Sequence, residues 1–170
     1  MCTRAVASWK LPLFPGKDAG GMARIWFMPG FDKVHVRWYC KFDANFDQGN
    51  LMHLNKLIAG IGHWSGYGAA GRRPSGFDFF RTSLDSWRDW GRNPPPGEMM
   101  LKANMAGMNN GEQAFWINGK LVGHFKNITW RYTNDLKINS FSLGPYIHDN
   151  KKVNRVWFDD VVVSAGYIGL

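Results

Sequence analysis

An Asn-Gly pair between two apolar-rich runs is the sequence feature that most restricts the fold. Asn118-Gly119 separates Gln113–Ile117 from Lys120–Phe125. Both residues of the pair tolerate the positive φ angles that a two-residue hairpin turn requires, so the flanking runs should pair as antiparallel strands. Two further extended segments follow, Leu136–His148 and Arg155–Val163, and both are rich in aromatic and β-branched residues. Because no stretch here repeats its apolar residues at helical spacing, the sequence predicts an all-β fold, an antiparallel β-sandwich.

The clearest periodicity in the chain lies at Val34–Phe42, where apolar residues alternate with polar ones. Period-two alternation places the two sets on opposite faces of a sheet, so the apolar set should pack into a core. The polar set is His35, Arg37, Tyr39 and Lys41. Such a row is most often only the solvent-facing side of an antiparallel sheet. It contains no carboxylate, however, and would also suit an anionic sugar chain lying across the strand, so we take these four as candidate substrate-binding residues.

A second candidate strand and a glycine-rich segment follow. Leu51–Ile58 should be a strand with His53 and Asn55 on one face and Lys56 on the other. A single histidine beside apolar residues is usually structural, and His53 is kept as a candidate because of the features described below. Residues 59–76 match neither a phosphate loop nor a dinucleotide fingerprint, so we interpret them as a mobile loop beside a groove.

The rest of the chain gives shorter or weaker signals. Residues 1–24 are expected to be loop-like, and residues 87–96 form a Trp- and Arg-rich connection that ends in three prolines. Shorter strands are expected at Arg24–Met28, closed by Pro29-Gly30, and at Phe77–Leu84 and Met99–Asn104. By its length the chain should form one domain over residues 1–170, with a poorly defined N-terminal segment.

The polar row of Leu136–His148 is the strongest candidate for chemistry. Alternation places Ser140, Ser142, Tyr146 and His148 on one face, backed by an apolar row. Tyr146 and His148 are two residues apart and should project side by side. They are interpreted either as an aromatic pair at the sheet margin or as a proton-transfer pair at the floor of a groove.

Charge and composition narrow the class of partner. The formal net charge is +8, from 21 Lys and Arg against 13 Asp and Glu, which fits either a solvated basic surface or a polyanionic ligand. The basic residues are scattered, and this weakens nucleic-acid binding. Cys2 and Cys40 are not expected to form a disulfide, and Cys and His show no metal-ligand spacing. We expect neither a secretory signal nor a membrane span within this chain.

These segments together resemble the concanavalin A-like jelly-roll polysaccharide lyases that act on alginate and glucuronan. The resemblance spans roughly residues 30–168 and rests on HVRWYCKFDANFDQGN, GEQAFWINGKLVG, LKINSFSLGPYIHD and NRVWFDDVVVSAGYIG. Its last third is the specific part, since such hairpins and the closing strand also occur in non-catalytic jelly rolls. The chain passes directly from Pro96 to Met99, where the related lyases have further strands, so the resemblance implies a shortened middle.

The resemblance implies a β-elimination on a uronate-containing polysaccharide. It makes Tyr146, His148 and His53 the candidate catalytic residues, and it places the anionic chain against the substrate-binding residues His35, Arg37, Tyr39, Lys41, Asn55 and Ser142. A free Tyr has a pKa of about 10, so Tyr146 would need a cationic neighbourhood, from Arg37 and the histidines, to act as a base. The chemistry requires no metal or organic cofactor, although a structural calcium would be compatible with it. A monomer outside the cell or in the periplasm is expected, with no nucleic acid or membrane as partner.

Three other functions stay open. A glycoside hydrolase would need two carboxylic acids across the scissile bond, whereas Glu98 and Glu112 are expected in or beside loops and Asp159-Asp160 on opposite faces of a strand. A non-catalytic carbohydrate-binding jelly roll could use Trp116, Trp130 and Trp157 to stack on sugar rings, although such residues are more often core. A nucleic-acid binder comes third, because no basic cluster or known motif supports it.

Overall fold

The computed structural model describes residues 2–5, 9–49, 51–69, 71–83, 85–87 and 97–169, and within them the chain forms strands, turns and loops but no helix. The strands of the described residues are β1 (Cys2–Ala5), β2 (Trp9–Leu13), β3 (Gly16–Gly20), β4 (Ala23–Phe31), β5 (Lys33–Phe42), β6 (Leu51–Gly60), β7 (Phe79–Thr82), β8 (Asp85–Trp87), β9 (Gly97–Lys102), β10 (Gly111–Ile117), β11 (Lys120–Ile128), β12 (Ile138–Asn150) and β13 (Asn154–Ser164). No helix of this part of the chain could therefore cross a membrane.

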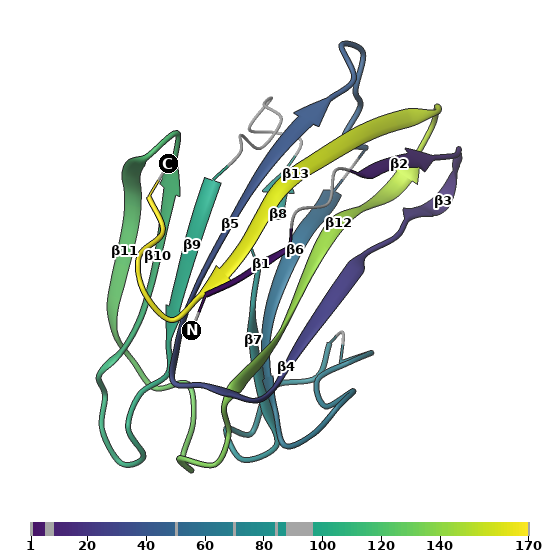
Figure 1. Cartoon of the computed structure of the whole chain (residues 1–170). Coiled ribbons are helices and arrows are strands. Elements are labelled where there is room, and N and C mark those ends of the chain that lie inside the picture. The colour runs from purple at the N-terminus through teal and green to yellow at the C-terminus, as the bar shows by residue number, and fades with distance from the viewer. Residues whose placement is uncertain are drawn as a thin grey trace.

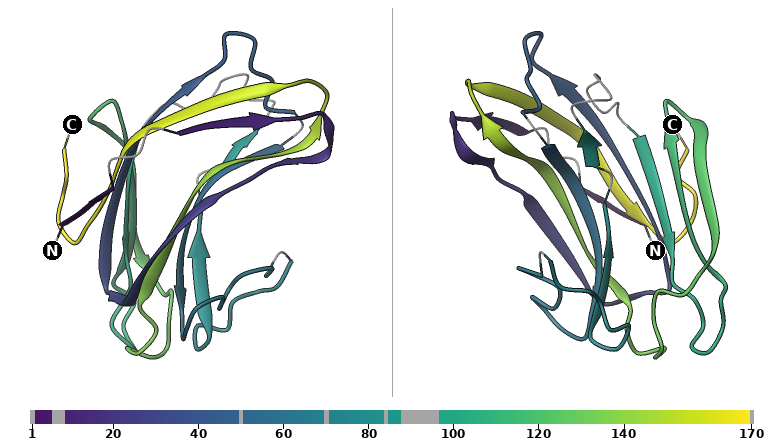
Figure 2. Two further views of the ribbon diagram at one scale, coloured as in Figure 1. Left: turned by 45° about the vertical axis from the view of Figure 1, so that its right-hand side comes forward. Right: turned by 180° about the vertical axis from the view of Figure 1, so that it is seen from behind.

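The strands form two antiparallel sheets that face each other across one core (Figure 1). The large sheet has the order β1-β13-β5-β9-β10-β11, and β2 also pairs with β13. The small sheet has the order β3-β12-β6-β7, with β4 also paired to β12 and β8 to β6. Figure 2 shows the two layers from the side, with the β6–β7 connection projecting outward from the small sheet. The predicted all-β antiparallel sandwich is confirmed.

The Asn-Gly hairpin forms as predicted. Ile117 pairs with Lys120 across the turn. The φ angles of Asn118 and Gly119 are 48° and 74°, the left-handed values that a type I′ turn needs. The hairpin places β10 and β11 at one margin of the large sheet, because β10 pairs with β9 on its other side.

Alternation along β5 builds the core, also as predicted. Val34, Val36 and Trp38 are at most 1% exposed. The Trp38 ring lies 5.9 Å, centroid to centroid, from Phe141 of β12, so the two layers are joined by aromatic packing. Burying side chains of this size is the main source of stability in a two-layer fold, at about 1.5–3 kcal/mol for each large apolar residue.

The expectation for the N-terminal segment was wrong. Residues 1–24, expected to be loop-like, contain β1, β2 and β3, and β4 runs on through Pro29-Gly30 to Phe31. These segments pair with β13 or β12, which lie at the far end of the chain. The glycine-containing β3 has no apolar alternation of its own, and its partner decides its conformation, whereas β2 does alternate, with Trp9, Leu11 and Leu13 on one face. Most of the Trp- and Arg-rich connection, residues 88–96, lies outside the described residues.

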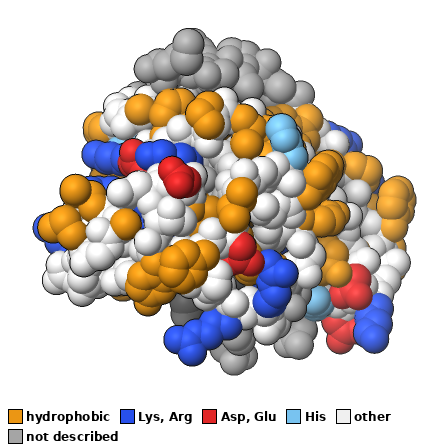
Figure 3. Space-filling view, turned by 90° about the horizontal axis from the view of Figure 1, so that it is seen from below, with side chains coloured by type: hydrophobic (Ala, Val, Ile, Leu, Met, Phe, Trp, Pro, Cys, Tyr) orange, Lys and Arg blue, Asp and Glu red, His pale blue; other side chains and the backbone are white. Residues whose placement is uncertain are grey.

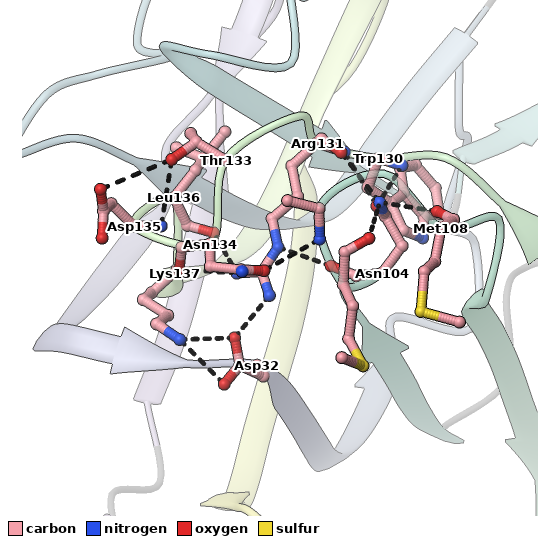
Figure 4. Close-up of polar contacts among 12 residues, drawn as sticks. Asp32, Asn104, Met108, Trp130, Arg131, Thr133, Asn134, Asp135, Leu136 and Lys137 are labelled. Atoms are coloured by element: carbon pink, nitrogen blue, oxygen red, sulfur yellow. Dashed lines mark hydrogen bonds and ion pairs between the residues drawn. The ribbon is translucent and has the colours of Figure 1, made fainter.

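Two loops at one end of the sandwich are held by a buried polar cluster, drawn in Figure 4. The Asn104 side chain accepts from the N–H groups of Trp130 and Arg131, at 2.7 and 2.9 Å, and donates to the Arg131 carbonyl at 2.8 Å. The Arg131 guanidinium, in a residue only 2% exposed, donates to the carbonyl of Leu136 and to Asp32, both at 2.7 Å. Seen from this end, Figure 3 shows separate hydrophobic patches between charged side chains of both signs.

Candidate functional site

A groove of about 790 Å³ lies on the face of the small sheet that points away from the core. Strands β4, β6 and β12 form its floor, and residues of the β6–β7 connection form one side. Its lining includes Arg24 and Trp26 of β4, His53, Lys56 and Ile58 of β6, Tyr146 and His148 of β12, Arg81 of β7, and Trp64 and Tyr67 of the connection. The predicted position of the glycine-rich segment beside a groove agrees with this arrangement, and its mobility stays a prediction.

Three of the predicted site residues meet on this floor. Tyr146 and His148 alternate along β12 and share a face, with ring centroids 5.1 Å apart. His53 pairs directly with Tyr146 across the β6–β12 ladder, and its ring lies 6.3 Å from Tyr146 and 5.5 Å from His148. The structure therefore brings together one phenol and two imidazoles, groups that can donate or accept protons near neutral pH.

Asp18 of β3 joins this cluster, and nothing in the sequence indicated it. Its Oδ1 lies 2.8 Å from Nδ1 of His148. The pKa of Tyr146 is raised above its ordinary value by partial desolvation, by the negative charge of Asp18 and by a hydrogen bond to Asp18. The Tyr146 hydroxyl is therefore protonated at neutral pH and can donate a proton. The cationic neighbourhood expected from Arg37 is absent here, since Arg37 lies in the large sheet.

The cationic side chains of the groove were not among the site residues predicted from the alternating sequence patterns. The Arg24 Nε donates to Ser142 Oγ at 2.9 Å. The predicted Ser142 is itself fully buried beneath this guanidinium and does not line the groove. Burial lowers the pKa of Arg24, but a guanidinium stays charged at neutral pH. Lys56 lines the groove together with His53, whereas the sequence predicted opposite faces.

Lys56 and His53 share a face of β6 because of a register shift in the β6–β12 ladder. The shift falls between the Leu143–Asn55 and Tyr146–His53 pairs, so the alternation of β6 changes phase there. Asn55 is fully buried and pairs with the core residue Leu143. It does not line the groove, and its predicted place beside His53 was wrong.

The polar row of β5 lies on the large sheet, away from the groove. His35 is 3% exposed and its Nδ1 lies 2.9 Å from Glu98 of β9, while Arg37 donates to Asp160 of β13 at 2.6 Å. The face was expected to lack carboxylates, but neighbouring strands supply them. Tyr39 and Lys41 line a separate hollow of about 300 Å³ beside Trp157. The four polar residues of β5 do share one face of the strand, as predicted, but none of them lines the groove.

The acids considered for a hydrolase also lie on strands of the large sheet. Glu98 is the second residue of β9 and Glu112 the second residue of β10, near strand ends, where a place in or beside loops had been expected. Glu112 is paired with Lys102 and His124, both at 2.7 Å, and these contacts hold its pKa below the usual value. Neither glutamate lines the groove. The described residues contain no cluster of three or more potential metal ligands from His, Cys, Asp and Glu, and the structural calcium stays a prediction.

The tryptophans named from the sequence do not line the groove either. Trp130 stacks on Phe80 at 5.7 Å, Trp116 lies near His35, and Trp157 lies beneath Lys10 and Lys41. The groove aromatics are instead Trp26, Trp64 and Tyr67. Trp64 and Tyr67 fall in the glycine-rich segment that was predicted to flank a groove, so the composition of this segment was a usable signal. No pattern in the sequence pointed to Asp18 or Arg24 as groove residues.

Comparison with known proteins finds likeness in structure alone. No family model and no curated protein sequence matches the chain. Among solved structures, alginate lyase vAL-1 from a Chlorella virus superposes with a TM-score of 0.65 at 14% identity, over 96% of this chain and 89% of that one. The endo-β-1,4-glucuronan lyase of the fungus Trichoderma reesei gives 0.61 at 15% identity, over 97% and 87%.

A third structure contains a ligand. It is a mutant of alginate lyase Aly36B in complex with an alginate tetrasaccharide, and it gives a TM-score of 0.61 at 12% identity, over 96% of this chain and 82% of that one. At these identities the likeness shows the fold: the chain is a jelly-roll β-sandwich like those of alginate and glucuronan lyases.

Proposed function

We propose that this protein is a polysaccharide lyase that cleaves a uronate-containing polysaccharide by β-elimination. The observation that carries the proposal is the meeting of Tyr146, His53 and His148 in a groove that also contains Arg24, Lys56 and Arg81. The fold is shared with lyases of alginate and glucuronan, which supports the proposal. A polymeric uronate as substrate agrees with a protein acting outside the cell or in the periplasm.

The groups of the groove match the demands of this reaction. A base removes the proton on the carbon next to the carboxylate, the resulting electron pair forms a carbon–carbon double bond, and the glycosidic oxygen leaves with a proton from an acid. Cations beside the carboxylate stabilise the negative charge that develops on it. Lys56, three residues from His53 along β6 and lining the same groove, supplies that positive charge.

The contacts support one assignment of acid and base. Desolvation and the nearby Asp18 raise the pKa of Tyr146 above its ordinary value, so its hydroxyl is protonated at neutral pH and is the acid that protonates the leaving oxygen. The imidazole of His53, across the ladder from Tyr146, is the base. His148 is held by Asp18 at 2.8 Å, and its ring packs edge-on against the Tyr146 ring and positions it.

The test is a screen for unsaturated uronate ends on alginate, glucuronan and pectate. Tyr146→Phe removes one oxygen and keeps the ring, so folding should survive while kcat falls by a factor of about 100 or more. Circular dichroism and the unfolding midpoint serve as controls for folding. A folded Phe variant that cleaves at the parent rate would show that Tyr146 is only a packed aromatic residue.

The second candidate is a non-catalytic module that binds anionic glycans. It is favoured by the exposure of Trp64 and Tyr67, at 62% and 63%, beside cationic side chains. Binding of a polyuronate by the parent protein without any unsaturated product would select this function over the lyase.

A further inference from the structure

The β6–β7 connection carries an exposed aromatic cluster at the end of the groove away from His148. We call Trp64 and Tyr67, together with Trp26 of β4 beneath them, the aromatic shelf. The ring centroids of Trp64 and Tyr67 are 5.3 Å apart, and those of Trp64 and Trp26 are 5.6 Å apart. Trp64 and Tyr67 are 62% and 63% exposed. Exposing such large aromatic side chains to water is unfavourable, and a cluster of them marks a contact surface.

The shelf is fixed in place by the residues beside it. The N–H of Tyr67 donates to the Trp64 carbonyl at 2.9 Å, which closes a turn between the two rings. Gly66, with φ at 74°, packs so closely that an added Cβ would lie 3.0 Å from the Phe79 ring. Arg81 donates to the Ala69 carbonyl at 3.0 Å and ties the connection to β7. A preorganised surface of this kind loses little conformational entropy when a ligand binds.

Positive charge lies against the shelf. The Arg24 guanidinium is 4.9 Å from the Tyr67 ring centroid and 5.4 Å from that of Trp26. Its Nε is bonded to Ser142, but its Nη1 is buried with no hydrogen-bond partner among the described residues. A buried N–H without an acceptor is costly, and a carboxylate is the acceptor that a guanidinium binds best.

The shelf is too far from the proton-transfer residues to hold the same sugar. Along β12, Ser142 beneath Arg24 is four residues from Tyr146, which corresponds to roughly 13 Å along a strand. Trp26 pairs with Ser140, which lies farther still from Tyr146. A ligand that reaches both places must contain several linked rings.

We propose that the aromatic shelf is a second sugar subsite, at which a uronate residue of the bound polymer stacks on Trp64 or Tyr67 and its carboxylate is bound by Arg24. The inference rests on the proposed function and deepens it. The groove then binds an oligomer rather than one sugar, and affinity and product length depend on the β6–β7 connection.

The test measures binding and cleavage separately. Binding of defined oligouronates is measured by calorimetry in a Tyr146→Phe background, so that no ligand is consumed. Trp64→Ala and Tyr67→Ala should each weaken binding of a tetramer about tenfold, which corresponds to about 1.4 kcal/mol. Phe125→Ala, which removes a 56% exposed ring from β11 of the other sheet, is the matched control and should leave affinity unchanged.

Arg24 is tested with a second ligand. Arg24→Gln should weaken binding of the acidic tetramer and leave unchanged the weaker binding of the same tetramer with its carboxyl groups reduced to alcohols. Trp64→Ala should weaken both, because stacking does not require the charge. Equal affinity of the parent, Trp64→Ala and Tyr67→Ala proteins for the acidic tetramer, with folding intact, would overturn the subsite.

Cleavage by proteins with an intact Tyr146 separates the two proposals. If the parent produces unsaturated ends and Trp64→Ala gives the same product lengths and affinity, the subsite is wrong and the lyase stands. If binding falls in Trp64→Ala but the parent never produces unsaturated ends, the subsite stands and the lyase is wrong. If the parent protein neither binds nor cleaves any oligouronate, both proposals are wrong.

Discussion

Asp18 links two titratable residues of the groove, because its carboxylate contacts both Tyr146 and His148. The carboxylate lies 2.8 Å from His148, and its charge and hydrogen bond raise the pKa of Tyr146. A phenol with a raised pKa stays protonated at neutral pH, so it can donate a proton but is a poor base. Asp18, in a stretch of sequence that gave no signal, thus adds to the desolvation that keeps the Tyr146 hydroxyl protonated at neutral pH.

This assignment predicts a shift of the pH profile in Asp18→Asn. If Tyr146 acts as the acid, activity is lost as the pH rises through its pKa. The substitution removes the negative charge that raises this pKa, so the alkaline limb of kcat/KM should move to lower pH. The measurement is kcat/KM against pH for both proteins. An alkaline limb that stays in place or moves to higher pH would contradict the acid role.

At the scale of elements, β12 organises the small sheet by pairing with β6 along one side and with β4 and then β3 along the other. The change from β4 to β3 occurs where Gly144 faces the Gly20–Gly21 segment. Gly144 and Gly20 both have φ of 143°, and a Cβ on Gly144 would lie against the Gly21 carbonyl oxygen. This close crossing allows Asp18, Tyr146 and His148 to meet.

Gly144→Ala should therefore be strongly destabilising. The added methyl group meets backbone atoms, and the left-handed φ is unfavourable for Ala, so we expect a loss of about 2 kcal/mol or more in the free energy of unfolding. Chemical denaturation of both proteins measures it. Gly166→Ala is the control, since nothing lies within 4 Å of its Cβ position. Equal stability of the two variants would show that the backbone at Gly144 and Gly20–Gly21 can move apart to make room for the methyl group.

At the scale of the whole molecule, the charge of +8 comes from cations on both sheets, and the partners of these cations differ. Cations of the large sheet such as Arg37 and Lys102 are paired with carboxylates at 2.6 and 2.7 Å. In the groove of the small sheet, Arg24 bonds instead to a serine hydroxyl. In the groove an anionic polymer would find positive charge close to the exposed rings of Trp64 and Tyr67.

We accordingly expect binding of polyuronates that weakens as salt rises. Screening shortens the reach of charge interactions to about 10 Å at 0.1 M salt and about 3 Å at 1 M, so affinity should fall across that range. Titration at several salt concentrations measures the effect, with a neutral glucan of similar length as the control. Equal, salt-insensitive affinity for the neutral glucan would count against an anionic substrate.

The sequence by itself determined the fold class and the pairing of the Tyr146 and His148 rings on one strand face. Alternation along β5 and the Asn118-Gly119 turn are local signals, since side-chain direction and turn geometry depend on neighbouring residues. For the same reason Tyr146 and His148, two apart on one strand, could be predicted to lie together. The resemblance to jelly-roll lyases added the architecture into which these segments fit.

Only the tertiary structure decided which residues share the groove. The polar rows of β5 and β12 have similar sequence patterns, yet β5 lies in the large sheet, where His35 contacts Glu98 and Arg37 donates to Asp160. Asp18 and Arg24 reach the groove because β3 and β4 pair with a strand about 120 residues later in the chain. Lys56 and Asn55 exchange faces at a shift in the β6–β12 register. Strand pairing and register depend on contacts between distant segments, which no local pattern encodes.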